Sequence, residues 1–126
     1  MGTRCYWCPY VCEGDKREIN RVRFALTKVL KEFNKRNSRY VAWLQVFVDV
    51  YERKVWYRVI VKSRASLKGG WGFEEAYFDF YYNIARGSRR FWTGDGFRIG
   101  IDCKYVSDVF RLALRLAEVF YGGVVG

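Results

Sequence analysis

Two strands of a β-hairpin stand out in the stretch RYVAWLQVFVDVYERKVWYRVIVKSR, residues 39–64. Successive side chains of a strand point to opposite faces of a sheet, so apolar residues at every second position predict a strand with one buried face. The segments at about 39–51 and 54–64 both show this alternation. The stretch therefore predicts a pair of neighbouring antiparallel strands.

The alternation also restricts how the two strands pair. With a turn centred on Glu52 and Arg53, Val50 lies opposite Val55, and the apolar residues of both strands share one face. A shift of one residue would mix the two faces, whereas an even shift would preserve them. We expect this register, or one related to it by an even shift.

The second face of the predicted hairpin mixes aromatic rings with positive charges, and its second strand adds no acid to it. The rings are Trp43, Phe47, Tyr51 and Trp56, and the cations are Lys54, Arg58, Lys62 and Arg64. Cations can follow a phosphate backbone, and each unpaired base stacked on a ring contributes about 1–3 kcal/mol. This pattern predicts a surface for single-stranded nucleic acid. The alternative is a face covered by a third layer or a partner subunit, with Lys and Arg stems packed over the rings.

The rest of the chain indicates an α+β domain. Helical periodicity at about 15–36, with Asp15 as the cap, precedes the hairpin; further strands are expected at about 73–83 and 89–93, and a final helix at about 104–121. This order predicts an N-terminal helix, an antiparallel sheet of four strands or five, and a C-terminal helix, with both helices packed on one face. The length of 126 residues suits a single domain, residues 1–126.

The charge balance points to an anionic partner. Lys and Arg total 23 against 13 Asp and Glu, without any His, for a net charge of +10. Nucleic acid or an anionic membrane surface are the usual partners of such a protein. No stretch approaches 18 uncharged apolar residues, and the first residues lack the apolar core of a signal peptide. We expect nucleic acid rather than a membrane, and a cytoplasmic protein.

Basic and aromatic residues outside the hairpin extend the predicted surface. The segment ARGSRRFW ends in RRFW, residues 89–92, and a loop before it carries Lys68 and Trp71. We expect Arg89, Arg90 and Trp92 to contribute to binding, and the Lys68–Trp71 loop to be either an ordinary solvated loop or a flap over the ligand.

Four cysteines form a second pattern. Cys5, Cys8 and Cys12 lie close together in the N-terminal segment 1–14, and Cys103 precedes the final helix. Four thiolates could hold zinc in a tetrahedral site, and the even number also fits disulfides, which intracellular proteins of hyperthermophiles do form. Either arrangement would pin the N-terminal segment to the body of the domain. No other cofactor is expected.

A metal-dependent nuclease is the enzymatic alternative. Asp95, Asp102 and Lys104 are spaced in a way similar to two carboxylates that hold Mg²⁺ and a lysine that positions water. The simpler interpretation is that Asp95 belongs to a glycine-flanked turn and that Asp102 caps the final helix. The absence of His from the sequence argues against thiol or hydroxyl catalysis that needs a histidine base.

The interleaved hairpin together with RRFW resembles the ThermoDBP and ThermoDBP-related single-stranded DNA-binding proteins of hyperthermophilic archaea. The resemblance implies a cleft lined by aromatic rings and flanked by cations, no cofactor, and binding that tolerates any sequence. We therefore expect a non-catalytic protein that binds single-stranded DNA, with RNA as a second ligand. The final helix is apolar on several sides, which favours a homodimer, and a structural protein with a buried sheet face is the remaining alternative.

Overall fold

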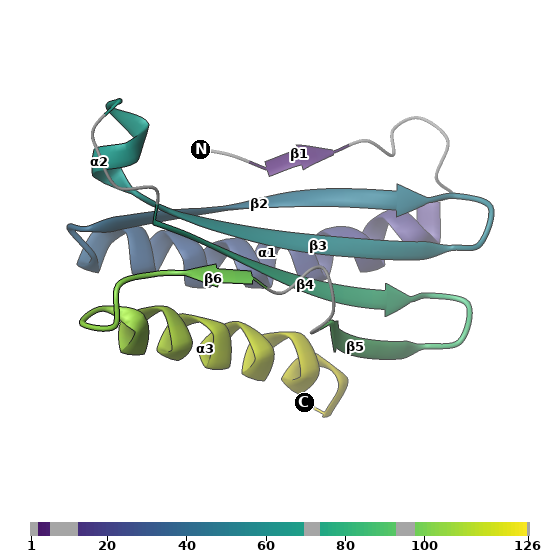
Figure 1. Cartoon of the computed structure of the whole chain (residues 1–126). Coiled ribbons are helices and arrows are strands. Elements are labelled where there is room, and N and C mark those ends of the chain that lie inside the picture. The colour runs from purple at the N-terminus through teal and green to yellow at the C-terminus, as the bar shows by residue number, and fades with distance from the viewer. Residues whose placement is uncertain (1–2, 6–12, 70–73, 93–97, 126) are drawn as a thin grey trace.

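The computed structural model describes residues 3–5, 13–69, 74–92 and 98–125, with the backbone alone at residues 3–5, 90–92, 98–99 and 123–125. The elements follow in the order β1 (Thr3–Cys5), α1 (Glu13–Arg36), β2 (Tyr40–Asp49), β3 (Lys54–Ser63), α2 (Arg64–Leu67), β4 (Glu75–Asn83), β5 (Ser88–Trp92), β6 (Arg98–Gly100) and α3 (Val106–Val125). Figure 1 shows the sheet in front of the two long helices.

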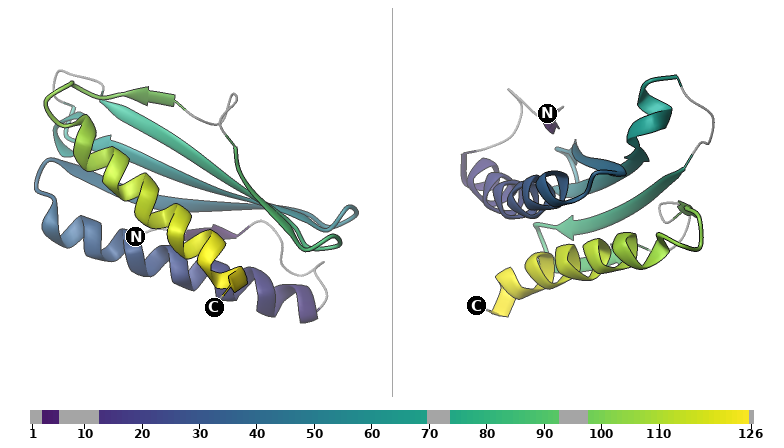
Figure 2. Two further views of the ribbon diagram at one scale, coloured as in Figure 1. Left: turned by 90° about the horizontal axis from the view of Figure 1, so that it is seen from below. Right: turned by 90° about the vertical axis from the view of Figure 1, so that its left-hand side faces the viewer.

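The predicted fold class is confirmed. Strands β2, β3, β4 and β5 form an antiparallel meander, and α1 and α3 pack on the same face of the sheet (Figure 2). Two short strands complete the sheet. Strand β1 pairs in parallel with β2 at one edge. Strand β6 pairs with residues 75–77 of β4, on the N-terminal side of residues 79–83, which pair with β5. The result is an open α+β sheet with one face covered by the two helices.

The hairpin pairs in a register two residues away from the predicted one. Val48 lies opposite Val55 and Phe47 opposite Trp56, so the predicted pairing of Val50 with Val55 is wrong. The loop is longer than expected because the side chain of Asp49 accepts hydrogen bonds from the backbone N–H groups of Tyr51 and Glu52, each at 3.1 Å. Since the shift is even, the side chains within the paired strands keep their predicted faces.

The inward face of the sheet and the two helices form one core. The hydroxyl of Tyr57 donates a hydrogen bond of 3.0 Å to the carbonyl of Ile19, which ties the centre of β3 to α1. On the other side of the core, Phe80 contacts Phe120 of α3, with ring centroids 5.1 Å apart. The helical periodicity of α1 and α3 is therefore explained by burial against the sheet.

Asp15 does not cap α1 as predicted. The helix begins at Glu13, so Asp15 lies in its first turn, and its carboxylate accepts two hydrogen bonds of 2.9 Å from Arg53. Arg53 belongs to the hairpin loop and has a positive φ of 56°. The ion pair therefore fastens the loop of the hairpin to the start of the helix beneath it.

Candidate nucleic-acid interface

The face of β2, β3 and β4 that points away from α1 and α3 is called the outer face below. Its members come from alternate positions of three strands, aligned by the pairing of the sheet. The aligned rows are Phe47–Trp56–Tyr81, Gln45–Arg58–Asp79, Trp43–Ile60–Tyr77 and Val41–Lys62–Glu75. Neither long helix covers this face, which is turned to the viewer in Figure 1.

The structure brings three of the four predicted stacking residues together. Trp43, Phe47 and Trp56 lie on the outer face and are half-buried. Strand β4 adds Tyr77 and Tyr81, which the sequence analysis missed. The rings of Trp56 and Tyr81 meet edge to face with centroids 5.2 Å apart and an angle of 63° between their planes. Alternation within EAYFDFYYN would have found both tyrosines, had this third strand been aligned with the hairpin.

The fourth predicted stacking residue, Tyr51, does not lie on the outer face. It belongs to the hairpin loop and is 95% exposed. The predicted strand ended too late, because Asp49 starts the loop two residues earlier than expected.

Acids from outside β3 pair with the outer-face cations. Arg58 donates two hydrogen bonds to Asp79, of 2.8 and 2.9 Å, and these bonds raise the pKa of the guanidinium. Lys54 lies 2.7 Å from a carboxylate oxygen of Glu52. The second strand of the hairpin adds no acid to this face, as its sequence shows, but Glu52 of the loop and Asp79 and Glu75 of β4 pair with its cations.

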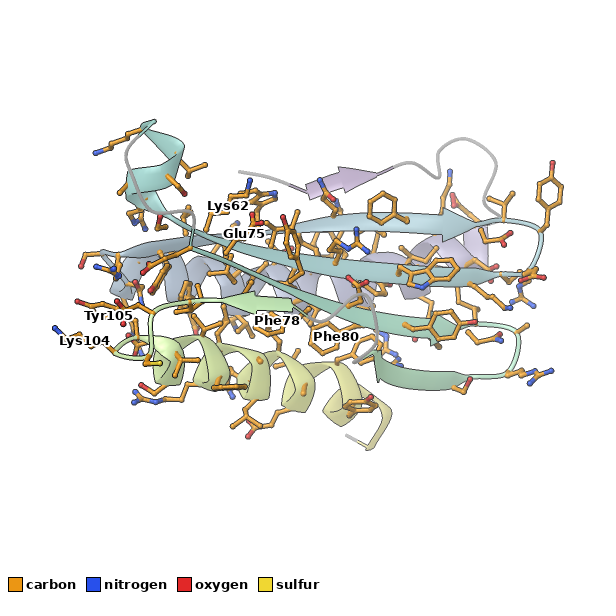
Figure 3. The ribbon with its side chains drawn as sticks, in the orientation of Figure 1. Lys62, Glu75, Phe78, Phe80, Lys104 and Tyr105 are labelled. Carbon is orange, nitrogen blue, oxygen red and sulfur yellow. The ribbon has the colours of Figure 1, made fainter. Side chains whose placement is uncertain are left out.

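Lys62 has the loosest of these ion pairs. Its ammonium lies 3.8 Å from Glu75, and Figure 3 shows the two side chains next to each other at the front of the sheet. The hydroxyl of Tyr77 donates to the same carboxylate oxygen at 2.9 Å. A distant, partly exposed pair of this kind contributes little to stability, so Lys62 can exchange its partner readily.

Arg64 was predicted to contact phosphate, but it lies off the outer face. Strand β3 ends at Ser63, whose hydroxyl caps α2 by accepting from the N–H of Ser66. The guanidinium of Arg64 instead donates to the carbonyls of Asn34 and Asn37, at 2.9 and 3.1 Å. Arg64 therefore satisfies carbonyls at the end of α1, which lack partners within the helix.

Arg89 lies on the helix side of the sheet, so the prediction that it extends the binding surface is wrong. It pairs with the inward residue Tyr82 across the strands, and its side chain is only 5% exposed. One nitrogen donates to the carbonyl of Phe120 at 2.6 Å and another to Glu18 at 3.1 Å. Arg89 thus joins β5 to both α1 and α3.

Arg90 and Trp92 are placed by their backbone alone. In β5 they pair with Tyr81 and Asp79 of the neighbouring strand. Their side chains lie outside the described residues, as does the whole of Trp71. Their predicted roles stay predictions.

The described residues include two of the four cysteines, Cys5 and Cys103. The backbone of Cys5 pairs with Val46 in the sheet, which holds β1 against β2. Cys8 and Cys12 lie outside the described residues, and Cys103 carries an exposed free thiol. The part of the chain that the structure describes contains no group of three or more metal-ligating side chains. The zinc and disulfide interpretations both stay predictions.

Two of the three residues of the nuclease alternative can be located. The carboxylate of Asp102 accepts a 3.0 Å hydrogen bond from the N–H of Lys104, and its carbonyl accepts one of 2.9 Å from the N–H of Tyr105. Asp102 thus shapes a turn just before α3, close to the expected cap. Lys104 is exposed at this end of the molecule (Figure 3), and Asp95 lies outside the described residues.

No helix in the described part of the chain is long and apolar enough to span a bilayer.

Searches against protein-family models, curated proteins and solved structures found no match, so the similarity to ThermoDBP-related proteins stays a prediction.

Proposed function

We propose that the protein binds single-stranded nucleic acid without catalysis, by stacking unpaired bases on the outer face. The observation that carries the proposal is a set of five rings on a sheet face that neither long helix covers. The rings belong to Trp43, Phe47, Trp56, Tyr77 and Tyr81. Stacking needs only the flat face of a base, so such a surface accepts any sequence and either DNA or RNA.

The ion pairs modify the predicted phosphate contacts. Arg58 is held by Asp79, which is only 3% exposed, and its guanidinium carbon lies 5.9 Å from the centroid of the Phe47 ring. We therefore assign Arg58 a positioning role. Lys54 and Lys62 have more exposed partners, so a phosphate can replace the carboxylate at little cost.

A fluorescence anisotropy titration with labelled single-stranded DNA, matching RNA and duplex tests the proposal. Trp56→Ala should weaken single-strand binding by about 1–3 kcal/mol. Tyr51→Ala is the matched control, because it removes an aromatic ring from the hairpin loop instead of the outer face. Equal affinities for the parent and Trp56→Ala would refute the stacking surface. A probe that stays intact with Mg²⁺ on a denaturing gel would support the absence of catalysis.

A homodimer with a buried outer face is the second candidate. It is favoured by the ion pairs, which neutralise the cations of the outer face. Light scattering separates the two: loss of a dimer in Trp56→Ala favours the interface, whereas an unchanged mass with weaker binding favours stacking.

As a nucleic-acid-binding protein, the molecule would act in the cytoplasm.

A further inference from the structure

One side of α1 carries a straight line of exposed residues, called the basic ridge below. Its members are separated by four, three, four, three and four residues, the spacing that keeps side chains on one face of a helix. All six are exposed: Arg17, Arg21, Phe24, Lys28, Lys31 and Lys35. The ridge spans about 27 Å at about 1.5 Å per residue.

The charges of the basic ridge differ from those of the outer face. Arg21 pairs with Glu18 at 2.6 Å, and the two side chains are 55% and 28% exposed. The other four cations of the ridge form no ion pair within the described residues. The ridge contains no acid. Among the described side chains, the cations of the outer face are therefore paired with acids, whereas most of those of the basic ridge are not.

Phe24 adds an apolar contact point within this line of charges. Its side chain is 62% exposed, and the guanidinium carbon of Arg23 lies 4.7 Å from the centroid of its ring. A solvated helix face needs no such ring, whereas a ring between cations can pack against the sugars of a nucleic-acid backbone.

The composition of the ridge selects among anionic partners. A helix that lies on a membrane needs a broad apolar face, but only one of the six ridge residues is apolar. A second copy of α1 would bring like charges together. A DNA duplex, by contrast, carries one charge per about 1.7 Å of its axis, and its major groove, about 12 Å wide, admits a helix. The major groove of duplex RNA is deep and narrow and does not admit a helix.

We propose that the basic ridge of α1 binds the phosphate backbone of duplex DNA. The ridge has one ring instead of a set of rings, which suits a duplex with hidden base faces better than a single strand. Figure 2 shows α1 against the inward face of the sheet. The buried residues of α1, among them Ile19 and Leu26, are on the side of the helix that faces the sheet, so the exposed basic ridge and the outer face are on opposite sides of the molecule. This surface does not depend on the stacking function and can be occupied at the same time.

Two triple variants with equal charge test the proposal. The ridge variant carries Lys28→Gln, Lys31→Gln and Lys35→Gln. The control variant carries Arg86→Gln, Lys104→Gln and Arg111→Gln, at positions that are also exposed and form no ion pair within the described residues. Both sets lower the net charge from +10 to +7, so they have the same effect on the overall field.

Affinity for a labelled DNA duplex is measured by anisotropy over a range of salt concentrations, after circular dichroism has shown that both variants fold. The ridge variant should lose affinity about tenfold or more, with a salt slope lower by about 3 units, while the control stays close to the parent. Equal losses in both variants would mean that only the overall charge matters, and would overturn the proposal. Equal affinities of all three proteins would overturn it as well.

Three further measurements distinguish binding at the basic ridge from binding at the outer face and from binding of other anionic partners. Trp56→Ala should bind the duplex like the parent, so that failure of the stacking surface and failure of the ridge give different results. Duplex RNA should bind more weakly than duplex DNA. Poly-glutamate that competes as well as duplex DNA would indicate an acidic protein partner and contradict the proposal.

Discussion

Arg58 and Asp79 form a two-pronged ion pair across β3 and β4, in the middle of the outer face. The two hydrogen bonds are 2.8 and 2.9 Å long, and the carboxylate is almost completely buried. A planar guanidinium matches a carboxylate in this geometry better than a lysine would. One of the four cations predicted to contact phosphate therefore links two strands of the sheet.

Arg58→Ala should lower the free energy of unfolding by about 1–3 kcal/mol, because it leaves the buried carboxylate of Asp79 without its charged partner. Part exposure of Arg58 keeps the effect below that of a fully buried pair. Urea denaturation measures the change. Lys62→Ala, which breaks the looser pair with Glu75, is the control and should cost about 0–1 kcal/mol.

In a binding measurement the order of the two variants should reverse: Lys62→Ala should change the salt dependence of the affinity more than Arg58→Ala does. If Lys62 contacts phosphate, Lys62→Ala lowers the salt slope for single-stranded DNA by about 1 unit. Arg58→Ala should leave the slope unchanged, since Asp79 already holds the guanidinium. A lower slope in Arg58→Ala would show that Arg58 releases Asp79 and contacts phosphate.

Arg89→Gln should destabilise the fold by about 1.5–3 kcal/mol, because it removes charged hydrogen bonds to Glu18 and to the carbonyl of Phe120. Arg86→Gln, in the exposed turn before β5, should stay within about 0.5 kcal/mol of the parent. Thermal denaturation of both variants gives the comparison. Equal stabilities would mean that Arg89 does not join the helices to the sheet.

Acid should destabilise the protein partly through Glu18. The hydrogen bond from Arg21, and after it the one from Tyr82, hold the pKa of Glu18 below the ordinary 4.5. The unfolded chain then binds a proton more readily than the folded one, so this stabilisation is complete above pH 4.5 and is lost as the pH falls through the lowered folded pKa.

Melting temperatures between pH 6 and about pH 3 test the role of Glu18. Glu18→Gln should be less stable than the parent at pH 6, and the difference should shrink as the pH falls. A difference that stays constant with pH would show that the charge of Glu18 does not stabilise the fold.

Asn34→Ala should weaken the edge of the sheet. The side chain of Asn34 donates to the carbonyl of Ala42 at 2.9 Å and accepts from its N–H at 2.7 Å, which satisfies backbone groups of β2 next to the stretch that β1 pairs with. Loss of both bonds should cost about 1–3 kcal/mol and speed hydrogen exchange of the Ala42 amide. Asn37→Ala is a poor control because Asn37 also caps the start of β2. Lys35→Ala, exposed on the neighbouring turn of α1, serves better.

Much of the fold is predictable because its patterns are local. The alternation within β2 and β3 and the periodicity of α1 determine which side chains are buried, and burial determines the layers of the domain. The register of the hairpin was missed by two residues because it depends on hydrogen bonds to Asp49 within the loop. Arg64 was misplaced because the capping of α2 by Ser63 ends the strand before it.

The sequence by itself determined the alternating hairpin, the α+β order of elements, the positive net charge and the rings of Trp43, Phe47 and Trp56 on one face. Only the tertiary structure decided what the charges contact. Asp79 and Glu75 reach Arg58 and Lys62 from a strand further along the chain, and Glu18 reaches Arg89 across the core. Side-chain direction follows from local periodicity, whereas the neutralisation of a charge depends on which distant segment the fold places beside it.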